Sequence, residues 1–173
     1  MKNKKVEIKT IPDGSNESSK GSDRSLIDSV NFLHTVLEGE EFYFTGSFAL
    51  KNLGLMSERR EINDLDIIVI NPKSLTVDLL KKFEVKSDKK YPGADNQIKI
   101  SIPSNYTVDI FFKVEPQKYI PSSFFGLDVK YCFPKHIIEA KLRCNRSKDI
   151  KDLYEMDKYL FPKDWVNLFT NTK

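Results

Sequence analysis

Apolar residues recur along the chain at two spacings, one helical and one alternating, and together they predict a mixture of helices and strands. Leu26, Val30 and Leu33 follow the helical spacing. This pattern predicts a first helix that starts near Ser25 and ends before Gly39, because glycine often follows the last helical turn. Further helices are expected at 48–53, 75–83, 135–143 and 147–160, with a final amphipathic turn at 165–169.

Short runs rich in β-branched and aromatic residues predict the strands, at 42–45, 65–70, 97–102, 107–114 and 127–131. About four residues separate the strands at 97–102 and 107–114, which suits an antiparallel hairpin. Residues 115–126 contain Pro116, Pro121 and Gly126, so an irregular connection is expected there.

Helices and strands mix without a regular alternation, so the expected class is α/β or α+β with a mixed, mostly antiparallel sheet flanked by helices. A length of 173 residues suits one domain, expected at 24–173 with a helical extension from about 134 to 173. Residues 1–23 are polar and predict a flexible arm, with a short strand or a partner-binding segment as the alternative.

The composition excludes several classes of protein. Hydrophobic residues make up 39% of the chain, which is enough for an ordinary core. The longest apolar run, 67–70, is far shorter than the roughly 18 residues of a membrane span, and no secretory signal follows Met1. Cys132 and Cys144 lack the spacing of a zinc or disulfide motif, so they predict reduced cysteines of a cytoplasmic protein.

The net charge of +3 is unevenly divided: +2 over residues 1–25, −3 over 26–129 and +4 over 130–173. A segment rich in carboxylates followed by a basic one suits a metal site that faces a polyanion such as a nucleotide. Ordinary surface charge is the alternative. Arg59 and Arg60, in the charged stretch before the strand at 65–70, are expected in a solvated loop, with contact to a triphosphate as the alternative.

Two kinds of polar position are candidates for chemistry. Gly46 and Ser47 lie between a strand and a helix start, where backbone amides and a hydroxyl can hold a phosphate. Asp64 and Asp66 open the most apolar strand and, two residues apart, point to the same side. Their repulsion calls for a raised pKa or a divalent cation, and carboxylate oxygens are the ligands that Mg²⁺ prefers.

Asp109 is surrounded by core-type residues in the strand at 107–114, where a carboxylate is costly unless it is paired or metal-bound. If this strand lies beside the strand of Asp64 and Asp66, the three acids form one cage for two metal ions. A buried acid bonded to nearby backbone is the alternative.

From about Phe42 to Phe112 these features resemble the nucleotidyltransferase superfamily typified by DNA polymerase β. The resemblance implies a triphosphate at Gly46 and Ser47, and two Mg²⁺ ions, or Mn²⁺, held by the aspartates at 64, 66 and 109. It also implies transfer of a nucleoside monophosphate from an NTP to an acceptor hydroxyl, with Asp109 assisting the attacking hydroxyl.

The segment Lys141–Leu153 resembles the Lys…Arg…Lys-Asp-x-x-Asp-Leu pattern of AbiEii-type toxins, which belong to abortive-infection and toxin–antitoxin systems. That resemblance implies nucleotide contacts for Lys141 and support of the site by Asp149 or Asp152. Surface pairs of Arg146 or Lys148 with these acids are the alternative.

The acceptor stays open between RNA such as tRNA, a protein, and a small molecule of the kind that lincosamide nucleotidyltransferases modify. A non-catalytic protein that keeps the fold, and is anchored in an assembly through residues 1–23, is the rival interpretation. No membrane association is expected.

Overall fold

The computed structural model of the chain describes residues 20–85, 96–104 and 106–157. Five helices and six strands occur there, in the order α1 (Lys20–Val36), β1 (Glu41–Thr45), α2 (Gly46–Asn52), β2 (Asp64–Ile70), α3 (Ser74–Lys81), β3 (Gln97–Ser101), β4 (Thr107–Lys113), β5 (Tyr119–Phe124), β6 (Leu127–Cys132), α4 (Pro134–Cys144) and α5 (Ser147–Asp157). The turn expected at 165–169 and the arm up to residue 19 lie outside the described residues.

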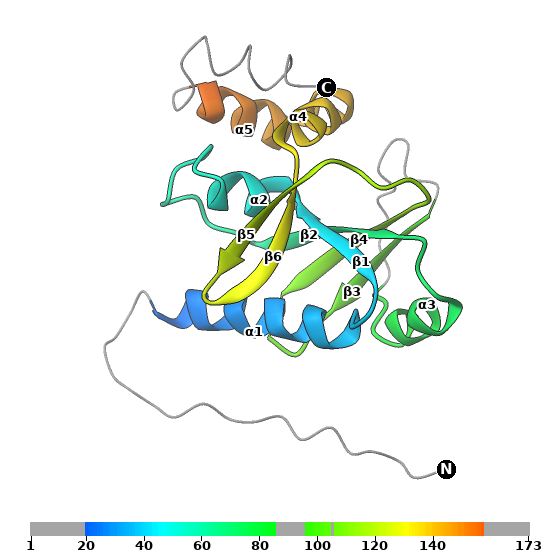
Figure 1. Ribbon diagram of the computed structural model, residues 1–173. Coiled ribbons are helices and arrows are strands. Elements are labelled where there is room, and N and C mark those ends of the chain that lie inside the picture. The colour runs from blue at the N-terminus through cyan, green and yellow to red at the C-terminus, as the bar shows by residue number, and fades with distance from the viewer. Residues whose placement is uncertain (1–19, 86–95, 105, 158–173) are drawn as a thin grey trace, which may run out of the picture.

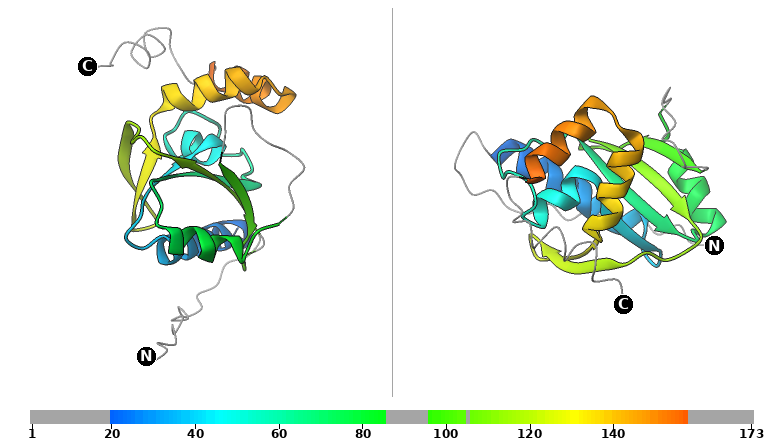
Figure 2. Two further views of the ribbon diagram at one scale, coloured as in Figure 1. Left: turned by 90° about the vertical axis from the view of Figure 1, so that its right-hand side faces the viewer. Right: turned by 90° about the horizontal axis from the view of Figure 1, so that it is seen from above.

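The six strands form one mixed sheet in the order β3-β4-β2-β1-β6-β5. The pairs β2–β4 and β1–β6 are parallel, whereas β1–β2, β3–β4 and β5–β6 are antiparallel. Helices α1 and α3 lie side by side below the sheet, and α4 and α5 lie above it with α2 beneath them (Figures 1 and 2). This arrangement confirms the predicted class and the hairpin of β3 and β4.

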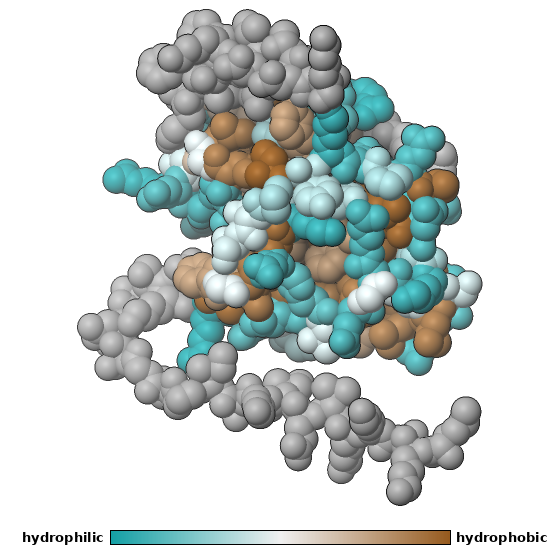
Figure 3. Space-filling model, in the orientation of Figure 1, coloured by the Kyte–Doolittle hydropathy of each residue, from teal (hydrophilic) through white to brown (hydrophobic). Residues whose placement is uncertain are grey.

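The core lies between the sheet and its helices because alternate strand residues are apolar. Leu65, Ile67 and Val69 of β2 are fully buried, and the helical spacing of α1 buries Val30 and Leu33 against the same core. In the orientation of Figure 1, hydrophilic side chains cover much of the surface and hydrophobic ones show as separate areas between them (Figure 3). Apolar burial therefore stabilises the fold in the usual way.

The helix α1 begins at Lys20, earlier than the start near Ser25 that the sequence predicts. Ser25 therefore lies inside the helix, and its hydroxyl donates to the backbone oxygen of Ser104 at 2.6 Å. This bond ties the middle of the helix to the turn that precedes β4.

The irregular connection expected at 115–126 is also wrong, because residues 119–124 form strand β5. Pro121 pairs with Lys130 of β6. Since β5 is the outermost strand, the missing amide of Pro121 costs no bond inside the sheet. Phe125 and Gly126, with φ of 49° and 83°, make the two-residue turn into β6, a conformation typical of tight hairpins.

At the other end of the sheet, residues 83–85 lie along the outer side of β3. Glu84 forms an isolated bridge with Ile100, and the amide of Val85 donates to the oxygen of Lys99 at 2.8 Å. Both ends of the sheet are therefore protected, by a proline at β5 and by a short segment of chain at β3.

The two cysteines are free, as predicted, with Cys132 buried in β6 and Cys144 at the end of α4. Burial raises the pKa of the Cys132 thiol to about 11, so this thiol is unreactive at neutral pH. Among the described residues, no helix has both the length and the apolar character that crossing a membrane requires. The cytoplasmic location stays a prediction.

Candidate active site

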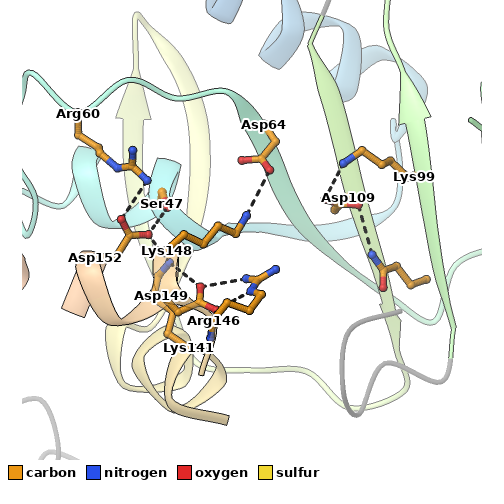
Figure 4. Close-up of polar contacts among 11 residues, drawn as sticks. Ser47, Arg60, Asp64, Lys99, Asp109, Lys141, Arg146, Lys148, Asp149 and Asp152 are labelled. Carbon is orange, nitrogen blue, oxygen red and sulfur yellow. Dashed lines mark hydrogen bonds and ion pairs between the residues drawn. The ribbon is translucent and has the colours of Figure 1, made fainter. Parts of the chain in front are cut away.

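Three aspartates predicted to act together lie on one face of the sheet. Strands β2 and β4 run parallel, with Asp66 opposite Asp109 and Asp64 opposite Thr107. Register partners in neighbouring strands point their side chains to the same face, and the strands are about 4.8 Å apart. Figure 4 shows Asp64 and Asp109 on these adjacent strands. The three acids therefore lie on one face of two neighbouring strands.

Asp66 carries the strongest electrostatic perturbation of the three acids. Burial raises the pKa of Asp66 to about 7, and the negative charges of Asp64 and Asp109 add to the effect. The charges of Lys141 and Lys148 oppose it without cancelling it. A nearby cation would therefore relieve the repulsion between the charges of Asp64 and Asp66.

Gly46 lies directly against the Asp66 carboxylate. The glycine has a φ of 64°, a conformation that other residues rarely adopt, and it begins α2 immediately after β1. A Cβ added there would stand 2.9 Å from Cγ of Asp66 and overlap one of its oxygens. Both backbone conformation and space thus require glycine at this position.

Asp109 is almost fully buried and is held from the neighbouring strand β3. Its Oδ2 lies 3.3 Å from Nζ of Lys99, and its Oδ1 accepts a hydrogen bond from Nε2 of Gln97 at 3.3 Å (Figure 4). Lys99 is the register partner of Asp109, so the two side chains share a face. An ammonium group therefore balances this buried carboxylate.

Asp152 of α5 joins three other segments around the aspartates. It accepts a hydrogen bond from Oγ of Ser47 at 3.1 Å and from Nζ of Lys141 at 2.8 Å, and pairs with a terminal nitrogen of Arg60 at 3.0 Å (Figure 4). Asp152 is 2% exposed and Lys141 8%. One carboxylate thus links α2, the loop before β2, α4 and α5.

Asp149 forms the second half of this ionic network. Arg146 donates to both of its carboxylate oxygens, at 2.6 and 2.9 Å, and Nζ of Lys141 lies 3.6 Å away. Burial alone would raise the pKa of Asp149, but the hydrogen bonds and charges of Arg146 and Lys141 outweigh it and lower the pKa. The pair of Arg146 with Asp149 that the alternative expected does form, but the carboxylates of Asp149 and Asp152 are buried and do not lie on the surface.

A small pocket of about 100 Å³ opens between this network and the aspartates. Its basic side chains are Arg60, Lys141, Arg146 and Lys148. Ser47, Asp64 and Asp66 also line it. Nζ of Lys148 lies 3.9 Å from Oδ2 of Asp64. A pocket with cations on one side and carboxylates on the other suits a phosphate group bound together with a metal ion.

Solved structures that resemble this chain share its fold. A putative nucleotidyltransferase from Thermotoga maritima, TM1012, is 13% identical over 83% of this chain and 94% of its own, with a TM-score of 0.52. The lincosamide antibiotic adenylyltransferase LnuA, solved with lincomycin bound, is 12% identical over 79% of this chain and 97% of its own, also with a TM-score of 0.52. The chain has the nucleotidyltransferase fold. No protein-family model and no curated protein matches it.

Within the nucleotidyltransferase fold, the carboxylates fit a divalent cation in part. Burial and the neighbouring charge of Asp64 both raise the pKa of Asp66, and a bound cation would relieve this penalty. Asp109, in contrast, already faces the ammonium group of Lys99. No group of three or more acidic, histidine or cysteine side chains in the described ranges has the arrangement of a metal site. The fit is therefore to the pair at 64 and 66.

Two side chains of the site differ from the sequence-based interpretation. Arg60 was expected in a solvated loop, yet it pairs with Asp152 and lines the pocket. Lys99 was not singled out, although it alternates with the buried Ile98 and Ile100 and lies opposite Asp109 in the predicted hairpin. Counting residues back from the turn of that hairpin would have found it.

We expect Gly46→Ala to disrupt the site more than the addition of a single methyl group usually does. The new methyl group would displace the Asp66 carboxylate and force alanine into a φ region that costs about 1–2 kcal/mol. Urea unfolding should show a loss of at least about 2 kcal/mol. Gly54→Ala is the matched control, since Gly54 also has a positive φ but nothing lies within 4 Å of an added Cβ. Equal losses in the two variants would contradict the close contact with Asp66.

Proposed function

We propose that the chain is a nucleotidyltransferase that moves a nucleoside monophosphate from an NTP to an acceptor hydroxyl. The acceptor oxygen would bond to the α-phosphorus, the bond from this phosphorus to the bridging oxygen of pyrophosphate would break, and the hydroxyl proton would leave to a base or to water. The placement of Asp64, Asp66 and Asp109 on one face beside Gly46, in a nucleotidyltransferase fold, supports this proposal.

Asp64 and Asp66 would hold the divalent cation, Mg²⁺ or Mn²⁺. When bound, such a cation lowers the pKa of a hydroxyl and neutralises charge on the leaving pyrophosphate. Asp109, on the adjacent strand, would orient the acceptor hydroxyl and receive its proton. These roles follow the family resemblance, residue by residue, at the positions that the sheet places together.

The basic side of the pocket would bind the phosphates. Lys141 and Arg60 are paired with Asp152, which also accepts a hydrogen bond from Ser47. Lys148 lies near Asp64. A triphosphate would add acceptor oxygens for these donors. Asp149 and Asp152 would act indirectly, because they hold the cationic side chains in place.

The acceptor is a separate question. A small hydroxyl compound as acceptor is supported by the similarity to LnuA, an antibiotic adenylyltransferase whose chain is matched over 97% of its length. RNA such as tRNA, or a protein, is supported by the AbiEii-type pattern at 141–153. A toxin–antitoxin or phage-defence role, with a protein partner at residues 1–23, would accompany the second option.

Labelled NTPs test the proposal directly. The purified chain is incubated with each α-labelled NTP and Mg²⁺ or Mn²⁺, and with itself, a tRNA pool or a panel of small hydroxyl compounds as acceptor. Label should move to one acceptor class, and EDTA should abolish the transfer. Binding of NTP without transfer to any acceptor would contradict catalysis and favour the non-catalytic alternative.

A further inference from the structure

Lys99 lies beside Asp109, one of the three acids that face the same side of the sheet. Its ammonium nitrogen lies 3.3 Å from Oδ2 of Asp109, and the amide of Gln97 holds Oδ1 from the same strand. Because β3 and β4 pair in antiparallel register with Lys99 opposite Asp109, the sheet itself fixes the contact. The pairing does not depend on a loop or on a bound ligand.

The burial of Asp109 makes this contact consequential. Only 1% of Asp109 is exposed, and a buried carboxylate is costly unless a hydrogen-bonded positive charge lies beside it. Lys99, whose side chain is 26% exposed, supplies that positive charge. The charge of Asp109 is therefore balanced within the protein.

Among the residues that the structure describes, no buried cation is paired with Asp64 or Asp66 on β2. Lys148 is 3.9 Å from Asp64, but its side chain is 51% exposed, so water screens much of the interaction. The remaining cations of the pocket are engaged by other acids: Arg60 by Asp152, Arg146 by Asp149, and Lys141 by both.

We propose that Lys99 takes the place of one divalent cation, so that the nucleotide-free protein binds a single divalent ion, at Asp64 and Asp66. Asp109 is then not a ligand of that ion. The inference rests on the proposed function for the ion at Asp64 and Asp66, and it adds a positioning role for Lys99. A lysine ammonium is a compact point charge, which suits it to this substitution.

The test counts Mn²⁺ ions bound to the full chain without nucleotide, from the electron paramagnetic resonance signal of free Mn²⁺ during a titration. Wild type should bind one ion per chain. Lys99→Met should bind two, because Asp109 loses its cation and becomes available as a ligand. Lys99→Arg should keep one ion, and Lys99→Met combined with Asp109→Asn should return from two to one.

Lys82→Met is the matched control, since Lys82 is exposed at the end of α3, and it should bind one ion. Circular dichroism checks that each variant is folded. If Lys99→Met does not fold, Lys99→Gln, which keeps a hydrogen-bond donor but no charge, replaces it with the same expected count of two.

Two ions on wild type would overturn the inference and leave the proposed function standing, as would one ion on the folded Lys99→Met or Lys99→Gln variant. No ion on wild type would overturn the inference together with the cation-binding part of the proposed function. The labelled-NTP assay measures transfer separately, so the two failures can be told apart.

Discussion

Replacing Asp66 with asparagine is expected to reduce nucleotide transfer at least about 1000-fold, because the amide keeps the shape of the side chain but loses the charge that holds the cation. Initial rates with the acceptor found by the labelled-NTP assay measure this loss. Asp78→Asn is the control, since Asp78 is exposed on α3 and lies 4.0 Å from Lys81 of its own helix. Transfer within tenfold of wild type would show that Asp66 does not hold the essential ion.

The same substitution should make the metal-free protein more stable at high pH. Because the pKa of Asp66 is about 7 in the folded state and 3.8 in its absence, the folded state binds the proton more tightly. The stability contributed by this proton is complete below pH 4 and is lost as the pH rises through about 7. Asparagine cannot ionise, so at pH 8 the variant should gain about 2–4 kcal/mol over wild type.

Urea unfolding in EDTA at pH 5 and pH 8 measures this gain. The difference between the variant and wild type should be clearly larger at pH 8 than at pH 5. A difference that is equal at both values would contradict the electrostatic penalty on Asp66, whatever the effect on transfer. Greater stability with less activity is the usual result of removing a charged group from an active site.

Asp152→Ala is expected to destabilise the fold by about 3–5 kcal/mol, the cost of breaking a buried ion pair. The substitution removes the partner shared by Ser47, Arg60 and Lys141 and leaves the buried Lys141 with Asp149 at 3.6 Å. It should also loosen α5 from the loop that carries Arg60. Urea unfolding at pH 7 measures the loss.

Two comparisons make this prediction specific. Asp78→Ala removes an exposed carboxylate and should change stability by less than about 0.5 kcal/mol. Asp152→Asn keeps the hydrogen bonds of one oxygen but not the charge, so it should lie between alanine and wild type. A loss below about 1 kcal/mol for Asp152→Ala would mean that the network does not stabilise the contact between α5 and the site.

Local patterns were sufficient for much of this fold. The β-branched run at 65–70 and the helical spacing around Leu33 predicted β2 and α1, since each repeats with the period of its own element. The strand β5 was missed because Pro121 normally argues against a strand, and only the sheet order shows that β5 lies at an end. That information depends on contacts between distant parts of the chain.

The candidate site could likewise be predicted only in part from local patterns. Spacing alone placed Asp64 and Asp66 on one side of a strand, whereas the neighbour relation with Asp109 needs the parallel register of β2 and β4, which no local pattern encodes. The partnership of Arg60 with Asp152 joins residues more than ninety positions apart. From the sequence alone, a charged residue is expected to lie in solvent. Only the tertiary fold shows which charged residues are paired with one another.

The protected ends of the sheet have a consequence for how the molecule meets other chains. Pro121 removes an amide donor from the free side of β5, and residues 83–85 occupy the bonding groups of β3 near Ile100. Both features disfavour the addition of a strand by an extended peptide, at Pro121 on β5 and at the covered part of β3. For the same reason, we expect edge-to-edge pairing between copies of this domain to be disfavoured.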